Sequence, residues 1–168
     1  EPLLKKLPSD VFYEWIKKGM ESKFLTRDAI CAWVLTQFEQ KEDVNLAEAM
    51  IGWGKVLYKV EAAMPEEKKA TVLRYNEEEF IWAQENESSF WNYLINEKLL
   101  FEFNQREKNN MLRPGPTTIG LPKKGGPDRL GQYLGWQMVR NYMSENDITL
   151  KELENVPYNK ILQAYEID

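Results

Sequence analysis

The sequence predicts an all-α protein, and three observations lead to this fold class. Apolar residues recur at helical spacing along most of the 168 residues, and side chains that cap helix N-termini precede several of these runs. The longest alternating apolar run, Leu99 to Phe103, is too short to indicate more than a minor sheet. We therefore expect a single helical domain over residues 1–168.

The two helices expected near the N-terminus each follow a residue whose side chain can accept a hydrogen bond from a free helical N–H group. Ser9 or Asp10 is the expected start of a helix that extends to about Met20. Thr26 is the expected start of a second helix that extends to about Gln40. The aromatic residues of this second segment, Trp33 included, are expected to fill the core.

Capping boxes, in which an Asn or Thr is followed three residues later by Glu, mark three later helices. They are Asn45–Glu48, Asn76–Glu79 and Thr149–Glu152. The first of these helices is expected to extend to about Met64 because Pro65 stops it. Further helical spacing starts or continues at Ser88, and a last short helix is expected around Ile161, Leu162 and Tyr165.

The segment from Gly131 to Tyr142 is predicted to be a helix although it contains Gly131 and Gly135. Each helical glycine costs about 1 kcal/mol relative to alanine, so close approach of another helix or of a ligand must offset this cost. Arg129, Tyr133, Trp136 and Arg140 form a stripe opposite the glycines. This stripe is either core packing or a binding surface.

Residues 104–128 are predicted to form a long loop because they contain four prolines and four glycines. From Asn104 to Arg129 there are six cations and two anions, a local charge of +4 in a chain of net charge -5. The cations are solvated charges of a surface loop, or they face an anion or a partner. Arg129, near the N-terminus of the Gly131 helix, would add to the attraction of the helix dipole for an anion.

The chain contains no histidine and one cysteine, Cys31. Zinc and related sites depend mostly on these residue types, so we expect no metal and no cofactor. Catalysis by a Ser-His-Asp or Cys-His arrangement is excluded. Cys31 lies in an apolar run and is expected to be a buried thiol.

The net charge of -5 argues against nucleic acid as a partner. No run of about 18 apolar residues is present, so no span through a membrane is expected. The chain begins Glu-Pro-Leu-Leu without an initiator Met or an apolar signal core. We therefore expect a processed or trimmed protein, with an anchor or an N-terminal region outside the sequence.

Three stretches carry a resemblance to a known family. They are Met50-Ile51-Gly52-Trp53-Gly54-Lys55-Val56-Leu57-Tyr58, Tyr75 to Trp82, and Gly126 to Tyr142 with its Leu-Gly-Trp-Gln-Met-Val-Arg-Asn-Tyr core. Over about residues 45–165 the chain resembles the gliding-motility-associated lipoprotein GldB family of the Bacteroidota. The resemblance implies a signal peptide and a lipidated cysteine upstream, a cell-envelope or periplasmic location, and a role near the gliding and type IX secretion machinery.

That family is in turn distantly similar to helical zinc peptidases, so the resemblance implies a zincin-related helical subdomain at most. In those peptidases a His-Glu-x-x-His helix and a later Glu hold the metal. Trp53 stands where the later Glu would be, and this chain cannot contain the histidine motif. The resemblance therefore implies a pseudo-peptidase whose metal site is lost.

These observations predict a non-catalytic envelope protein that binds an envelope protein or a glycan and meets the membrane only through a lipid anchor outside this chain. One alternative is a glycan- or peptide-binding protein that uses a remnant peptidase cleft. A second alternative is a carboxylate-based hydrolase. The candidate binding residues are Trp53, Lys55, Tyr58, Arg129, Tyr133, Trp136, Gln137 and Arg140.

Overall fold

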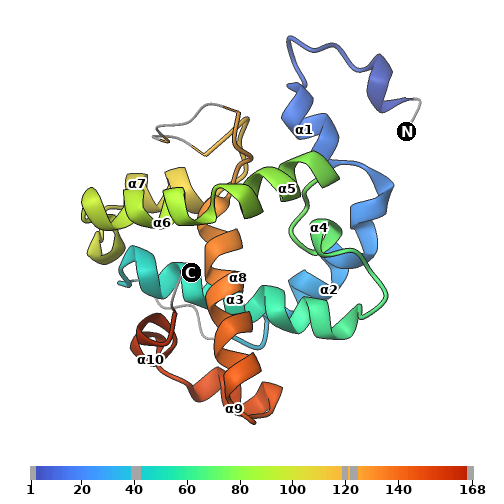
Figure 1. Ribbon diagram of the computed structural model, residues 1–168. Coiled ribbons are helices and arrows are strands. Elements are labelled where there is room, and N and C mark those ends of the chain that lie inside the picture. The colour runs from blue at the N-terminus through green and yellow to red at the C-terminus, as the bar shows by residue number, and fades with distance from the viewer. Residues whose placement is uncertain (1–2, 39–42, 119–120, 122–124, 166–168) are drawn as a thin grey trace.

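A computed structural model describes residues 3–38, 43–118, 121 and 125–165 (Figure 1). The described residues form α-helices and short 3-10 helices and include no strand, so the all-α prediction is confirmed. The α-helices are α1 (Glu14–Gly19), α2 (Leu25–Leu35), α3 (Leu46–Ala63), α4 (Lys69–Val72), α5 (Glu77–Glu85), α6 (Glu87–Asn96), α7 (Gln105–Leu112), α8 (Leu130–Glu145), α9 (Leu150–Asn155) and α10 (Tyr158–Gln163).

The centre of the fold is the crossing of α3 and α8, the two longest of these helices (Figure 1). They cross where Gly54 meets Gly135, so closely that a Cβ atom on either glycine would overlap backbone atoms of the other helix. A Cβ atom on Gly131 would stand 3.0 Å from the carbonyl oxygen of Met111, on α7. The predicted close approach at both glycines of α8 is confirmed, and it offsets their low helix propensity.

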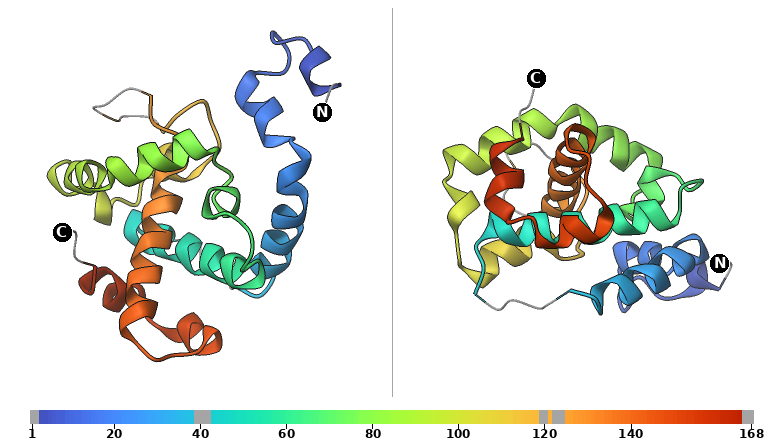
Figure 2. Two further views of the ribbon diagram at one scale, coloured as in Figure 1. Left: turned by 45° about the vertical axis from the view of Figure 1, so that its right-hand side comes forward. Right: turned by 90° about the horizontal axis from the view of Figure 1, so that it is seen from below.

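The other helices surround this crossing. Helices α2, α4, α9 and α10 pack on α3, and α7 packs on α8. Helices α5 and α6 follow one another on the side of α8 that faces away from α3, in front of α8 in the view of Figure 1. Figure 2 shows that the N-terminal arm, from Leu3 to α2, lies to one side of this body. None of the helices in the described ranges is long and apolar enough to cross a membrane.

All three capping boxes are placed as predicted at helix N-termini. The side chains of Asn45, Asn76 and Thr149 accept hydrogen bonds from backbone N–H groups three residues on. In the last two the glutamate also bonds back to the capping residue. The third predicted helix ends at Ala63, within a residue of the expected Met64.

The predicted start of the first helix is wrong. Helix α1 begins at Glu14, because Ser9 uses its hydroxyl to bond the side chains of Glu14 and Lys17 rather than helical N–H groups. Helix α2 begins at Leu25 as the continuation of a 3-10 turn and ends at Leu35, and the predicted end at Gln40 lies outside the described residues. Leu99–Phe101 is a 3-10 helix, not a strand.

The predicted loop over residues 104–128 is too long, because Gln105–Leu112 forms α7. The side chain of Asn104 caps this helix by accepting a hydrogen bond from the N–H group of Arg106. The prolines begin only at Pro114, so nothing in this stretch breaks a helix. Residues 119–120 and 122–124 of the loop lie outside the described part of the chain.

Two further predictions concern burial. Cys31 is buried as predicted, and its burial raises the pKa of the thiol. Trp33, two residues on, was expected in the core but is 66% exposed. The buried face of α2 carries Arg27, Cys31 and Val34, so a side chain at position 33 points away from it.

Candidate functional site

A basic cavity of about 550 Å³ lies between α2, α3, α7 and the start of α8. Of the described side chains that line it, five are cationic and one is acidic. The cations are Arg27, Arg74, Lys108, Arg113 and Arg129, and the acid is Asp28. This set concentrates positive charge in a chain whose formal charge is -5.

Arg27 is held rigidly at the wall formed by α2, with only 5% of its surface exposed. Its Nε donates a hydrogen bond to the carbonyl oxygen of Val72 at 2.7 Å. Its Nη1 donates to Oδ1 of Asp28 at 3.1 Å, which is an ion pair between adjacent residues. The guanidinium is therefore fixed chiefly by backbone and by a neighbour on its own helix.

Arg74 and Arg129, which also line the cavity, share an unusual backbone conformation. Their φ angles are 58° and 54°, in the left-handed region that L-residues rarely adopt. Nη2 of Arg129 donates to the carbonyl oxygen of Arg74 at 3.4 Å, so the two segments are joined directly. Such strained residues persist where the surrounding structure over-determines them, and they cluster at ligand sites.

The two arginines have acidic neighbours at different distances. Arg129 forms a nearly buried ion pair with Asp128 at 2.9 Å. Arg74 lies 3.4 Å from Asp28, and its Nη2 also donates to the carbonyl oxygen of Gly19. Burial lowers the pKa of Arg74, and Asp28 partly opposes this shift. Both arginines also line a second, smaller cavity beside Trp15 of α1.

Helix α7 contributes the remaining charge. Lys108 is 6% exposed, and its Nζ donates to the carbonyl oxygen of Val44 at 2.8 Å. Arg113 follows the last residue of α7 and is exposed at the mouth of the cavity. Gln132 of α8 ties this end of α7 in place, because its Nε2 donates to the carbonyl oxygen of Leu112 at 2.7 Å.

A groove of about 610 Å³, lined by both apolar and polar side chains, adjoins the basic cavity between the end of α2, α3 and the α9–α10 connection. Phe38, Trp53 and Tyr158 give it aromatic walls. Trp53 lines both the groove and the cavity and is half-buried between them. The two hollows therefore form one continuous surface.

The structure brings only part of the predicted site together. Trp53 and Arg129 meet at the basic cavity. Lys55 lines the groove, but it is buried and its Nζ donates to the carbonyl oxygens of Glu154 and Val156, at 3.1 and 2.6 Å. Lys55 therefore fastens α9 and the following turn to α3. Tyr58 is half-buried and packs against the core.

The rings of the predicted stripe on α8 lie in the interior. Tyr133 and Trp136 are 1% and 0% exposed, and Phe80 contacts both of them edge to face. Trp136 Nε1 donates to Glu61 at 2.8 Å, so the indole is satisfied internally. Of the two alternatives left open for these rings, the structure shows core packing, because Phe80 of α5 contacts both of them and Glu87 of α6 bonds Tyr133.

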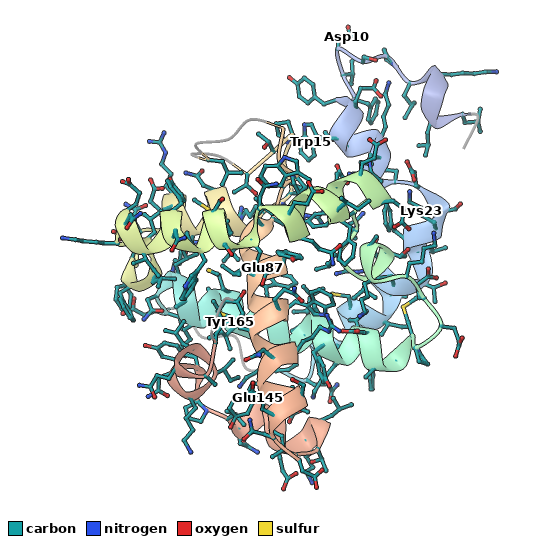
Figure 3. All side chains as sticks on the ribbon, in the orientation of Figure 1. Asp10, Trp15, Lys23, Glu87, Glu145 and Tyr165 are labelled. Carbon is teal, nitrogen blue, oxygen red and sulfur yellow. The ribbon has the colours of Figure 1, made fainter. Side chains whose placement is uncertain are left out.

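Gln137 and Arg140 belong to a polar network around these rings. Glu87 accepts hydrogen bonds from Gln137 at 2.8 Å and from the hydroxyls of Tyr133 and Tyr165. Figure 3 shows Glu87 and Tyr165 beside α8, so the C-terminal segment is fastened to the body at this point. Arg140 stacks on Trp136, with its guanidinium carbon 4.6 Å from the ring centroid.

Sequence reasoning missed Arg27 and Arg74 as members of the site, and it counted Lys108 only as one of the cations of the predicted loop. Arg27 carried a usable signal, since it falls on the same helical face as the apolar Cys31 and Val34. Lys108 lay in a segment predicted to be a loop. Arg74 reaches the cavity only through the tertiary fold. Of the cations counted in the predicted loop, Lys108, Arg113 and Arg129 line the cavity, Arg106 does not, and Lys123 and Lys124 lie outside the described residues.

The described residues contain no group of three or more His, Cys, Asp or Glu side chains that could hold a metal. The guanidinium and ammonium groups of the basic cavity can bind an anion through charge-assisted hydrogen bonds.

Comparisons with known proteins place the chain in a family. A search of curated proteins and a search of solved structures each returned no match. The family described as gliding motility protein GldB matches residues 4–166, which extends the predicted region of resemblance to nearly the whole chain. Because this match covers nearly all of its residues, the protein belongs to the gliding motility protein GldB family.

Proposed function

We propose that this protein is a non-catalytic component of the cell envelope that binds another, negatively charged envelope component through the basic cavity. The family supports the envelope location, because its members are gliding-motility lipoproteins. The single observation that carries the binding role is the excess of cations around the cavity, five against one acid.

The partners of these cations explain why the cavity favours an anion. Lys108 donates to the carbonyl oxygen of Val44, and Arg27 donates to that of Val72. A carbonyl oxygen satisfies a hydrogen bond but does not cancel a formal charge. Because Asp28 and Asp128 supply only two negative charges nearby, an acidic partner would neutralise what the fold leaves uncompensated.

Several features support a non-catalytic role. The chain has no histidine, and burial raises the pKa of its single thiol, Cys31, which keeps it protonated and unreactive. Glu61 accepts a hydrogen bond from Trp136, and Glu154 is paired with Lys59. These carboxylates are engaged in a structural hydrogen bond and an ion pair, so a hydrolase that works through them is the less favoured alternative.

The aromatic side chains of the groove favour a second candidate function, the binding of a peptide or a glycan. Aromatic side chains stack on sugar rings and pack against peptide side chains, and Phe38, Trp53 and Tyr158 line this groove. In this alternative the groove is the remnant of a peptidase cleft. The two candidates share Trp53 and differ in whether the cations or the groove make the decisive contacts.

Affinity purification of the tagged full chain from the native envelope, followed by mass spectrometry, tests the proposal. Arg113→Glu reverses an exposed charge at the cavity, and Arg106→Glu reverses an exposed charge elsewhere on the same segment. We expect partners to be lost with Arg113→Glu and kept with Arg106→Glu. Equal recovery with both variants would contradict the proposal.

A third variant separates the two candidates. Gly52 lines the groove but not the cavity, and nothing lies within 4 Å of the position of an added Cβ atom. Gly52→Phe would therefore fill the groove without disturbing the fold. Capture that survives Gly52→Phe supports the cavity, whereas capture that is lost only with Gly52→Phe supports the peptide or glycan alternative.

A further inference from the structure

We propose that the basic cavity is a binding site for a phosphate monoester or a diphosphate, whose organic part lies near Trp53, in the apolar part of the cavity. This inference rests on the proposed function, since it names the chemical class that the same cavity recognises. It is carried by the placement of the cations, by their free donors and by the size of the cavity.

The cations reach the cavity from different directions. Arg27 comes from α2, Lys108 from α7, and Arg129 from the residue before α8. A carboxylate offers two oxygens in one plane, which a single arginine fork can satisfy. A phosphate monoester offers three oxygens arranged around a tetrahedral centre, so it can use donors from several sides at once.

Charge leads to the same class of ligand. Five cations and Asp28 line the cavity, so their formal sum is +4, and counting the neighbouring Asp128 leaves +3. A carboxylate with one negative charge would compensate only a small part of this excess. A phosphate monoester carries between one and two negative charges at neutral pH, and a diphosphate carries more.

Donors remain for such a ligand. A guanidinium has five N–H groups, and the contacts of Arg27 with Val72, Asp28 and Cys31 use at most three of them. An ammonium has three donors, and the contact of Lys108 with Val44 uses one. These side chains are already immobilised in the free protein, so a ligand would not have to order them on binding.

The volume of the cavity indicates an ester rather than a free ion. About 550 Å³ is far more than one phosphate group fills, and it falls in the range of sites for small organic molecules. Leu35, Ala49 and Trp53 also line the cavity and give it an apolar part. A phosphorylated lipid headgroup and a soluble phosphate ester share this chemistry, and experiment can separate the two sources.

Titration calorimetry of the purified full chain at constant ionic strength tests the inference. The soluble probes are glycerol 3-phosphate, pyrophosphate and acetate. The lipid probe is a phosphatidylcholine vesicle with or without phosphatidic acid. We expect at least one phosphate probe to bind and acetate to bind much more weakly.

Two variants and one control locate the site. Lys108→Gln removes a charge while the new amide can still donate to Val44, and Arg113→Gln removes an exposed charge at the mouth. Each should weaken phosphate binding about tenfold or more, because a hydrogen bond to a charged group is worth roughly 1.5–3 kcal/mol. Arg106→Gln, outside the cavity, should leave the affinity unchanged. If Lys108→Gln lowers the melting temperature strongly, Arg113→Gln decides alone.

Each outcome has a defined meaning. Binding of the vesicles alone identifies a lipid headgroup, and binding of the soluble probes identifies a soluble ester; both support the inference. Acetate binding of equal strength, an equal loss with Arg106→Gln, or no binding of any phosphate probe would overturn it. Partner capture that depends on Arg113 without phosphate binding would leave the proposed function standing and refute only the ligand class.

Discussion

Gly54 and Gly135 lie in direct backbone contact where α3 crosses α8, and a Cβ atom on Gly54 would meet the peptide bond between Gly135 and Trp136. A Cβ atom on Gly135 would in turn overlap the carbonyl group of Met50. Backbone atoms cannot move aside as the end of a flexible side chain can. The crossing of α3 and α8 therefore depends on glycine at both positions.

We expect Gly135→Ala to destabilise the protein although alanine is the better helix former. The added methyl group would force α3 and α8 apart, which typically costs about 1–3 kcal/mol, and this exceeds the gain in helix propensity of about 1 kcal/mol. Urea unfolding followed by circular dichroism measures the change in the free energy of unfolding.

Gly52→Ala is the matched control, because Gly52 lies in the same helix α3 with open space around its Cβ position. There the gain in helix propensity should act alone and stabilise the protein by up to about 1 kcal/mol. Stabilisation by both substitutions would show that the crossing is looser than the structure indicates.

Arg129 and Arg140 should differ in their contribution to stability. The ion pair of Arg129 with Asp128 is nearly buried, so Arg129→Ala leaves this carboxylate without its ion-pair partner and should cost about 3 kcal/mol, although the N–H group of Gly115 still donates to it. The pair of Arg140 with Glu61 is longer, at 3.6 Å, and both side chains are partly exposed. Arg140→Ala should cost about 1 kcal/mol, since Trp136 still donates to Glu61.

Urea unfolding of the two single variants checks this difference. The double variant Arg129→Ala/Asp128→Asn serves as a control, because removing both charges should recover part of the loss. Equal losses in the two single variants would mean that the buried pair of Arg129 contributes no more than the partly exposed pair of Arg140.

Cys31 should be nearly inert in the folded protein. It lines the basic cavity, yet its side chain is buried, and burial raises the pKa of the thiol. Only the thiolate reacts with a disulfide reagent, so the native protein should react much more slowly than the protein in guanidinium chloride. Absorbance after addition of the reagent measures both rates. Similar rates would show that α2 opens readily from the body.

The fold class was predictable because it depends on local signals. The Asn76–Glu79 and Thr149–Glu152 capping boxes lie within four residues of sequence, and each marks the start of a helix in the structure. The start of α1 was not predictable, because the hydroxyl of Ser9 had two types of partner available and bonds side chains instead of backbone. The glycines of α8 predicted a close contact but not its partner, since Gly54 lies 81 positions earlier.

The site was harder to predict than the fold. The helical spacing of Tyr133 and Trp136 showed that they share a face, but two faces of α8 are covered and only the tertiary structure reveals this. Arg74 and Arg129 lie 55 residues apart. Their left-handed backbone conformation could not be predicted from the sequence, because arginine usually avoids this conformation. Charge counting along the loop found Arg113 and Arg129 because those residues are close in sequence.

The last prediction concerns stability at alkaline pH. Burial raises the pKa of Tyr75, Tyr133 and Tyr165, and the hydrogen bonds of the last two to Glu87 raise it further. In the unfolded chain a tyrosine ionises near pH 10. Above that pH the unfolded state binds fewer protons than the native state, so these tyrosines make the free energy of unfolding fall as pH rises.

Each of the three phenols should contribute about 1.4 kcal/mol of this loss per pH unit above about pH 10. Urea unfolding at several pH values from 9 to 11.5 gives the slope. Tyr165→Phe should reduce the slope by the contribution of one tyrosine, while lowering stability at neutral pH because Glu87 loses a donor. An unchanged slope in Tyr165→Phe would show that its hydroxyl ionises as readily in the folded protein as in the unfolded chain, and that the C-terminal segment does not stay fastened to Glu87.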